Sequence, residues 1–127
     1  MERRDWDPEL LALIDGAVEL DIETMAADGA VHRATIWAVV DAGDVFIRSW
    51  KGDRGRWYRE IRERPEAVLH VAGRAVSVRA EPATDPESVQ RVSDGLTAKY
   101  GSSSPASTAG MLLPATLPTT LRLVPAG

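Results

Sequence analysis

The sequence contains no cysteine, and this absence excludes disulfide bridges, thiolate metal ligands and cysteine nucleophiles. It contains only two histidines, His32 and His70, which stand far apart and beside apolar residues. Because a metal site or a histidine base needs converging partners, we expect both histidines to be structural and expect no bound metal. The sequence also lacks a Gly-x-Ser-x-Gly elbow and a Walker loop, which argues against a hydrolase or a nucleoside triphosphatase.

Long apolar runs are missing as well. No stretch approaches the ~20 apolar residues that a membrane-spanning helix needs. The amino terminus, Met1–Asp7, has no apolar core of the kind that a signal peptide requires. We therefore predict neither membrane insertion nor export, and together with the absence of cysteine this favours a cytoplasmic protein.

The chain has 127 residues, of which 44% are hydrophobic, and this suits one compact domain spanning residues 1–127. The formal net charge of -4 argues against a binder of nucleic acids or anionic membranes, because such proteins usually carry a broad basic face. The charges are unevenly distributed, however. Every charged residue from Asp5 to Asp28 is acidic, whereas seven basic residues lie between Arg48 and Arg64, so a local anion site is compatible with the overall charge.

Hydrophobic periodicity and turn residues predict short strands with helices inserted between them. The expected strands cover residues 18–23, 31–40, 45–50, 68–71, 75–80 and 119–124, and the expected helices cover 8–16, 57–64 and 86–100. Gly101 is expected to end the last helix in a left-handed conformation, and the Ser- and Gly-rich stretch 101–110 is expected to be a mobile loop. Because no regular strand-helix-strand repeat occurs, we predict a mainly β, α+β fold with an antiparallel barrel rather than a parallel sheet.

One segment, Arg48–Arg59, concentrates cations, glycines and aromatic rings at the end of an apolar strand. Arginine forks bind phosphate oxygens in pairs, glycines let backbone N–H groups approach an anion, and indole faces can cover a flat heterocycle. The segment is therefore typical of a site for a phosphate and a ring. Its candidate ligand contacts are Arg48, Ser49, Trp50, Lys51, Arg54, Arg56 and Trp57.

The arginines of this region also have a purely structural interpretation. On a short helix they form exposed ion pairs with Glu60 or Glu63 that contribute at most ~1 kcal/mol each. This favours a surface role for the arginines at positions 59, 62 and 64. For Arg54 and Arg56 the ligand role and the surface role both stay open.

The tryptophans have structural interpretations too, because large aromatic side chains most often pack in a core or at an interface. Trp37 lies in the middle of an expected strand and is therefore expected in the core. Trp50 and Trp57 flank the cationic segment, so a pocket wall and a subunit contact are both open for them.

Several strings of the sequence resemble a known family. They are Thr35–Val40, Phe46–Ser49, Gly52, Gly55–Arg59, Lys99–Gly101 and Thr120–Pro125, and they cover most of the chain. The chain resembles an uncharacterised bacterial family, a domain of unknown function that is related to the superfamily of FMN-binding split barrels. That superfamily also holds pyridoxamine phosphate oxidases and deazaflavin-dependent nitroreductases. The resemblance implies an antiparallel split β-barrel with inserted helices.

In such split barrels, the resemblance implies, the flavin lies across the second and third strands. By this resemblance the residues that face the ring system are Arg33, Thr35, Ile36 and Trp37. Those that face the phosphate are Ser49, Lys51, Arg54 and Arg56. The sequence departs from the compact phosphate grip of the superfamily in its longer turn, which places the acid Asp53 among the cations.

Three functions are open on the sequence alone. The first is a homodimeric split barrel that binds FMN or a deazaflavin and transfers hydride to a small organic acceptor, and since the flavin carries the hydride, no catalytic residue is identified. The second is a dimeric barrel without a cofactor, which acts as an interaction module or binds an anionic metabolite, and Asp53 favours it. The third is RNA binding through Arg48–Arg59, against which the acidic net charge speaks.

Overall fold

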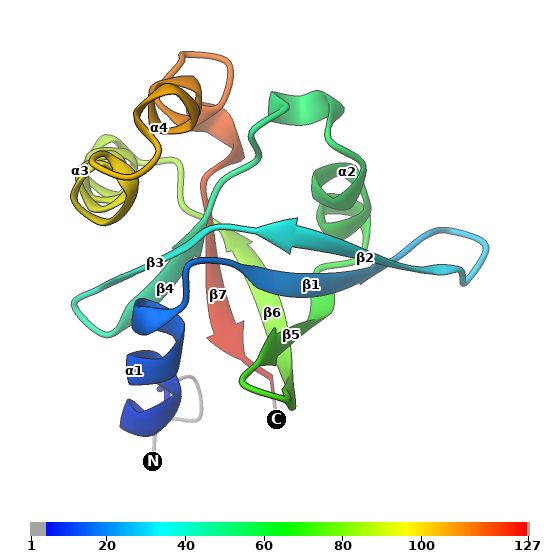
Figure 1. The fold of residues 1–127 in the computed structure, drawn as a ribbon. Coiled ribbons are helices and arrows are strands. Elements are labelled where there is room, and N and C mark those ends of the chain that lie inside the picture. The colour runs from blue at the N-terminus through cyan, green and yellow to red at the C-terminus, as the bar shows by residue number, and fades with distance from the viewer. Residues whose placement is uncertain (1–4, 127) are drawn as a thin grey trace.

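The computed structural model of the protein describes residues 5–126. Residues 1–4 and 127, and with them much of the amino-terminal stretch that we interpreted as lacking a signal peptide, lie outside the described residues. The strands are β1 Leu20–Met25, β2 Val31–Ile36, β3 Ala38–Asp41, β4 Asp44–Ile47, β5 Glu66–Val71, β6 Arg74–Pro82 and β7 Leu121–Pro125. The helices are α1 Pro8–Gly16, α2 Arg56–Glu63, α3 Pro86–Tyr100 and α4 Pro105–Met111, with short 3-10 turns η1 Gly52–Arg54 and η2 Leu117–Thr119 (Figure 1).

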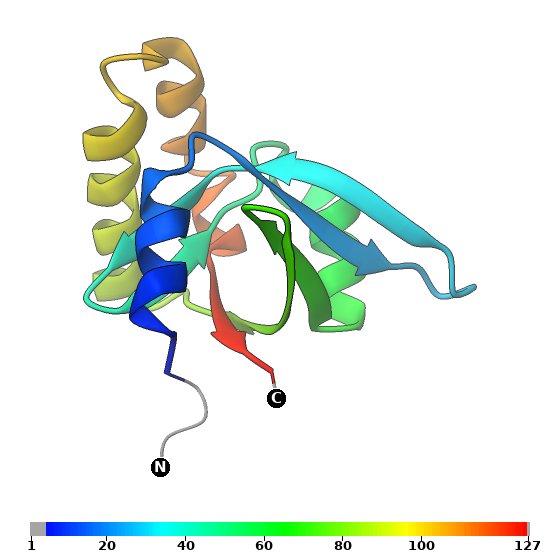
Figure 2. The ribbon, with the colours of Figure 1, turned by 60° about the horizontal axis from the view of Figure 1, so that its bottom comes forward.

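The strands form one sheet in the order β2-β1-β5-β6-β7-β4-β3, and each neighbouring pair is antiparallel. The strands β2 and β3 form the two edges of this sheet, yet only Trp37 separates them in the chain. One continuous segment therefore joins both edges, so the sheet has to curl round on itself, as Figures 1 and 2 show. The prediction of an antiparallel barrel with inserted helices is confirmed.

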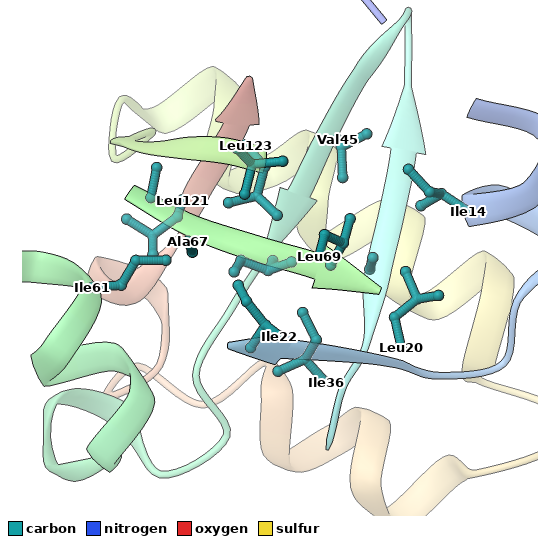
Figure 3. Close-up of a cluster of buried hydrophobic side chains, with 14 of the residues drawn as sticks. Ile14, Leu20, Ile22, Ile36, Val45, Ile61, Ala67, Leu69, Leu121 and Leu123 are labelled. Carbon is teal, nitrogen blue, oxygen red and sulfur yellow. The ribbon is translucent and has the colours of Figure 1, made fainter. Parts of the chain in front are cut away.

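The interior of the barrel is filled by aliphatic side chains from strands on all sides (Figure 3). Ile22, Val45, Leu69 and Leu123 are all 0% exposed. The period of two in β1 produces this burial, because its inward residues are buried while its carboxylates point outward. Burying each such side chain contributes about 1.5 to 3 kcal/mol, so this cluster is the main stabilising feature of the barrel.

Helix α1 closes one end of the barrel by inserting Ile14, which is 0% exposed, into the same cluster. Its start follows from the sequence as predicted: the Asp7 side chain accepts a hydrogen bond of 2.8 Å from the backbone N–H of Glu9, and Pro8 occupies the first turn. The Trp6 indole donates to the backbone carbonyl of Leu123 at 3.0 Å. This bond fixes the entry of the chain against β7.

Helices α3 and α4 lie side by side outside the barrel, against β3 and β4 (Figures 1 and 2). A second apolar cluster joins them to the sheet and contains Val39, Phe46, Ala83, Val92, Leu96, Tyr100 and Met111. Gly95 allows the close approach of α3, because a Cβ atom at this position would lie 2.5 Å from Val39 Cγ1. None of the helices within residues 5–126 is both long and apolar enough to cross a membrane.

Two expected strands differ from those observed. The run 31–40 is not one strand, since the chain bends at Trp37 so that its first half pairs with β1 and its second half with β4. The strand expected at 45–50 ends at Ile47. It ends there because the backbone N–H of Ser49 bonds to the Thr119 side chain at 2.9 Å instead of continuing the ladder.

The stretch 101–110, expected as a mobile loop, contains the helix α4, and that expectation was wrong. Gly101 is right-handed, with φ -59° and ψ -36°, so it is not the expected left-handed cap. Pro105 stands in the first turn of α4, where its fixed φ favours helix formation. The last residue of the helix, Met111, anchors it to the rest of the protein, because this side chain is 6% exposed and belongs to the second apolar cluster.

Candidate functional site

Three adjoining hollows surround the side chain of Trp50, which is 57% exposed. The tryptophan hollow, about 260 Å³, is lined by Glu19, Thr35, Ile36, Trp37, Arg48, Trp50, Trp57, Ser107 and Met111. The loop hollow, about 470 Å³, is lined by Ala34, Thr35, Ser49, Trp50, Lys51, Gly55, Arg56 and Trp57. The leucine hollow, about 430 Å³, is lined by Trp50, Lys51, Gly52, Arg54, Gly110, Leu113, Ala115 and Thr116.

The aromatic walls of the tryptophan hollow are held by other aromatic rings. Trp37, at the bend between β2 and β3, stacks on Tyr100 with 3.8 Å between ring centroids and 5° between ring planes. The Tyr100 hydroxyl donates to the Val18 carbonyl at 2.7 Å, and burial raises the pKa of Tyr100 to about 12. Trp57 meets Tyr58 edge to face at 6.2 Å. Trp37, expected in the core, is instead half-buried: it packs against the second apolar cluster and also lines the hollow.

The indole of Trp50 is positioned by a glycine in the neighbouring helix. A Cβ atom at Gly110 of α4 would lie 2.7 Å from Trp50 Nε1, so the bare backbone of Gly110 gives the ring its seat. Trp50 lines all three hollows, and it therefore forms the wall between them.

Replacing Gly110 with alanine is expected to move the Trp50 indole out of this seat. The ring is at the exposed end of a side chain, so it can shift at little cost, while the helix gains about 1 kcal/mol from the loss of glycine. We expect a red-shifted tryptophan emission with unfolding free energy unchanged or raised. The measurement is steady-state fluorescence beside thermal unfolding, with Trp50→Phe as the control that removes the shift. An emission spectrum unchanged by Gly110→Ala would contradict this positioning.

Arg48, expected among the cations of the loop, is instead 1% exposed. Its Nε donates to the Thr120 hydroxyl at 2.9 Å, and its two terminal nitrogens donate to the Ser93 hydroxyl and to the carbonyls of Val89 and Met111 at 3.0 to 3.1 Å. Arg48, predicted as a ligand contact, lines the tryptophan hollow, but these bonds engage all three of its guanidinium nitrogens and tie β4 to α3, α4 and β7. All four acceptors are uncharged, and burial lowers the pKa of Arg48 to about 10.

The turn that follows Arg48 depends on two glycines. Gly52 has φ +66°, and its carbonyl accepts a bond of 2.7 Å from the Ser49 hydroxyl. A Cβ atom at Gly55 would lie 2.6 Å from the Ser49 oxygen, so only glycine fits there. The Ser49 hydroxyl, expected to face a phosphate, is thus 1% exposed and already donates its proton within the turn.

The loop hollow offers positive charge and a helix amino terminus. Lys51 and Arg56 line it and are exposed. Helix α2 begins at Arg56, and no side chain caps its first N–H groups. Uncapped N–H groups and the positive end of the helix dipole favour an anion at this position. The arrangement can therefore bind a phosphate or a carboxylate.

The structure brings together most of the predicted site residues but not all of them. Arg54 lines the leucine hollow, whereas Arg56 lines the loop hollow. Arg33 lines none of the three hollows. Its Nε donates to Asp21 at 3.0 Å on the outer face of β1 and β2. The remaining ring candidates, Thr35, Ile36 and Trp37, all line the tryptophan hollow.

The sequence did not indicate that α4 and the segment after it line the hollows. Ser107 and Met111 line the tryptophan hollow, and Gly110 and Leu113 line the leucine hollow. The available signal was Pro105 after Ser104, a pair that often starts a helix. Its neighbours are serine, alanine and glycine, so the pattern lacked an apolar period.

Neither histidine lines any of the three hollows, and each pairs with a carboxylate. His70 Nε2 lies 2.6 Å from Glu23, and His32 Nδ1 lies 2.7 Å from Glu60, which also accepts from the Thr24 hydroxyl at 2.7 Å. Glu60 belongs to α2, so these bonds fix that helix to β1 and β2. Within the described part of the chain, no group of three or more potential metal ligands converges.

The Glu60 contacts predict a loss of stability in acid. Burial alone would raise the pKa of Glu60, but hydrogen bonds from Thr24 and His32, with the nearby Arg56, outweigh it and lower the pKa. A carboxyl with a lowered pKa stabilises the fold above its ordinary titration range, and this contribution is lost as the pH falls through the folded pKa. Glu60→Gln should therefore lower the unfolding free energy by about 1 to 2 kcal/mol at pH 7. Denaturant unfolding from pH 7 to pH 3 should show the difference in unfolding free energy between the two proteins shrinking once the pH falls below the ordinary titration range of glutamate. A difference that stays constant with pH would contradict this prediction.

The fold and the hollows define a class of protein: a small antiparallel split barrel with a ligand-sized hollow beside the bend that joins its two edge strands. The chain belongs to the bacterial family described as "Uncharacterized protein conserved in bacteria (DUF2255)", which it matches over residues 10–123. The family resemblance expected from the sequence is thereby confirmed. No curated protein matches the chain.

Solved structures share the fold at low sequence identity. A candidate pyridoxamine 5'-phosphate oxidase from Listeria innocua is 14% identical, with 94% of this chain and 92% of that chain covered and a TM-score of 0.68. HutZ, the heme storage protein of Vibrio cholerae, is 13% identical, with 95% and 90% covered and a TM-score of 0.67. The conserved hypothetical protein Rv2991 of Mycobacterium tuberculosis is 13% identical, with 100% and 84% covered and a TM-score of 0.66. These likenesses confirm the predicted split-barrel fold.

Proposed function

We propose that this protein binds a flat, phosphate-bearing cofactor, FMN or a deazaflavin, with the ring in the tryptophan hollow and the phosphate in the loop hollow. The observation that carries the proposal is the junction of the two hollows. They share Thr35, Trp50 and Trp57, so an aromatic-walled space continues directly into one that holds Lys51 and Arg56. Indole faces suit a flat heterocycle, and paired cations at an uncapped helix suit a phosphate.

The residues present fit such a cofactor in size and chemistry. Ligand pockets usually enclose roughly 300 to 1,000 Å³. The tryptophan hollow of about 260 Å³ is smaller than this range by itself, but joined to the loop hollow of about 470 Å³ it lies within the range. Trp37 and Trp57 would hold the ring, and Lys51 with Arg56 would hold the phosphate. A flavin or deazaflavin supplies hydride transfer when bound. The buried charge of Arg48 at the tryptophan hollow would favour an electron-rich ring, and the tryptophans would exclude water from it.

The substrate of such an oxidoreductase is proposed to be a small organic acceptor. The tryptophan hollow has a volume of about 260 Å³, and Ser107 of α4 also lines it. No side chain of the described residues is assigned a catalytic role. We also propose a cytoplasmic location, which the lack of cysteine and of long apolar runs in the sequence supports.

We further propose that the protein forms a homodimer. Three of its large apolar side chains are exposed along β1 and β2 or just before them: Val18 at 71%, Val31 at 56% and Met25 at 44%. Met25 and Val31 are register partners in the β1–β2 hairpin, which projects from the barrel in Figures 1 and 2. Exposed apolar side chains on a projecting hairpin suit a subunit contact. Light scattering of the purified protein tests the dimer.

A second candidate function is a cofactor-free barrel that acts as an interaction module or binds an anionic metabolite. The observation that favours it is that two of the predicted ligand contacts are used inside the protein. The Ser49 hydroxyl donates to Gly52, and Arg48 makes four bonds within the protein. The remaining contacts, Lys51 and Arg56, suit any small anion.

A fluorescence and absorbance titration with FMN, then with the deazaflavin coenzyme, separates the two functions. Saturable binding that Trp57→Ala weakens equally for FMN and for riboflavin supports a ring in the tryptophan hollow. Riboflavin has the same ring without the phosphate, so the comparison isolates the ring contact. Absence of binding to both cofactors would leave the cofactor-free function as the better proposal.

A further inference from the structure

We infer that the leucine hollow is a second binding site, for a small anionic amphiphile: a carboxylate or phosphate on a short aliphatic chain. The hollow shares Trp50 and Lys51 with the loop hollow of the proposed cofactor site and has a volume of about 430 Å³. Three observations support this inference: cations that have no partner among residues 5–126, an exposed aliphatic wall and a rigid floor.

The cations of the leucine hollow are Lys51 and Arg54, and both are exposed. Neither makes an ion pair or a side-chain hydrogen bond with another of residues 5–126, in contrast to Arg33 and Arg91, which pair with aspartates. The neighbouring acid, Asp53, is exposed and does not line the hollow. Two cations with no internal acceptor leave their N–H groups available to an anion.

The wall beside these cations is apolar and open. Leu113 is 58% exposed and Trp50 is 57% exposed, and Ala115 and the bare backbone of Gly110 lie between them. The Thr116 hydroxyl is turned inward, donating to the Met111 carbonyl at 2.7 Å. Apart from the Trp50 indole N–H, the wall therefore offers no side-chain donor, and it favours an aliphatic chain over a polar one.

The floor of the hollow is preformed. Gly52 has φ +66°, and a Cβ atom there would lie 3.0 Å from the Ala115 carbonyl oxygen. This close approach packs the turn that carries Lys51 and Arg54 directly onto the segment that carries Leu113. Because the cations and the wall are already held together, a ligand would not have to order them on binding.

The occupant follows from this pairing of charge and wall. The proposed cofactor uses two aromatic-walled hollows that share Trp57, whereas the leucine hollow contains a single aromatic side chain and mostly aliphatic surface. An anionic head between Lys51 and Arg54 with its chain over Leu113 satisfies both parts. The structure assigns the same chemistry to fatty acids and alkyl phosphates, and the experiment has to compare the two.

The experiment is a calorimetric titration of the full chain with sodium octanoate at low ionic strength. Octanoate should bind saturably, hexanoate should bind more weakly by about fourfold per methylene removed, and octyltrimethylammonium, the same chain with the opposite charge, should not bind. Octyl phosphate beside octanoate shows which head group the site prefers. Octyltrimethylammonium binding as tightly as octanoate overturns the inference, because the cations would then play no part.

Variants locate the site. Arg54→Gln and Leu113→Gln should each weaken octanoate by about three- to tenfold, since each removes one part of the site. Arg62→Gln is the matched control, because Arg62 is exposed on α2 and lines none of the three hollows, and it should leave the affinity unchanged. Equal losses in Arg54→Gln and Arg62→Gln would mean attraction to net charge only and would overturn the inference.

Arg56→Gln separates this inference from the proposed function. Arg56 lines the loop hollow and not the leucine hollow, so the substitution should weaken FMN and leave octanoate unchanged. Octanoate weakened by Arg56→Gln and not by Arg54→Gln would place the anion in the loop hollow and overturn the inference alone. Octanoate binding with the expected variants and no FMN binding would uphold the inference while the proposed cofactor fails.

Discussion

Replacing Arg48 with methionine is expected to lower the unfolding free energy by about 3 kcal/mol. The substitution removes the donors of four hydrogen bonds. The Ser93 and Thr120 hydroxyls lose the donor that they accept from, while the Met111 carbonyl keeps its bond from Thr116. Each such loss costs about 1 kcal/mol or more when the acceptor is buried. The gain from no longer burying an unpaired charge offsets part of this cost. For a domain of this size the melting temperature should fall by about 10 to 15 °C.

Denaturant unfolding followed by circular dichroism measures this change. The matched control is Arg59→Met, because Arg59 is exposed on α2 and a surface substitution of this kind changes stability by no more than about 0.5 kcal/mol. Arg48→Lys should recover only part of the loss, since lysine keeps the charge but cannot reach four acceptors with a planar fork. Equal stability of Arg48→Met and the native protein would mean that the bonds of Arg48 only balance the cost of its burial.

The barrel could be predicted because its pattern is local. Strand β1 shows its period of two directly, and α1 shows both its aspartate cap and its proline. Turn residues separate the strands of each hairpin. The bend at Trp37 could not be predicted, because it depends on one segment pairing with β1 at one edge and β4 at the other. That pairing is a property of the closed sheet and leaves no mark on the local sequence.

The role of Arg48 was hidden for the same reason. In the sequence it stands beside Lys51 and Arg54 and shares their charge, so it was grouped with them. Its partners lie far along the chain, at positions from Val89 to Thr120. A buried arginine and a ligand-binding arginine can stand in the same local sequence, so only the three-dimensional structure distinguishes them.

The arginines at 54 and 56 show how far the sequence could predict the site itself. Two residues apart, they were expected to face one phosphate, yet the turn at Gly55 sends Arg54 to the leucine hollow and Arg56 to the loop hollow. Composition indicated the segment that supplies Trp50, Lys51, Arg54 and Arg56 to the hollows, and its role in binding a ligand stays a prediction. It could not identify which cations converge, since that depends on the φ of +66° at Gly52 and on contacts with the distant Ala115.

The second prediction tests whether the charges of Lys51 and Arg56 converge on the FMN phosphate. Replacing Lys51 and Arg56 together with glutamine is expected to weaken FMN roughly 30- to 150-fold. Both side chains are exposed, so each charged hydrogen bond to the phosphate should contribute about 1 to 1.5 kcal/mol, below the range of buried ones. Their loss adds to about 2 to 3 kcal/mol, which corresponds to this change in Kd.

The probe that makes this prediction specific is riboflavin, which carries the flavin ring without the phosphate. The double variant should bind riboflavin as tightly as the native protein does, because Lys51 and Arg56 line the loop hollow and not the tryptophan hollow. Arg54→Gln is the matched charge control and should leave both ligands unaffected. Raising the salt concentration should weaken FMN in the native protein and have little effect in the double variant, since screening acts on the same two charges. If the double variant weakens FMN and riboflavin alike, the cations support the ring or the fold rather than the phosphate, and the loop hollow is not the phosphate site.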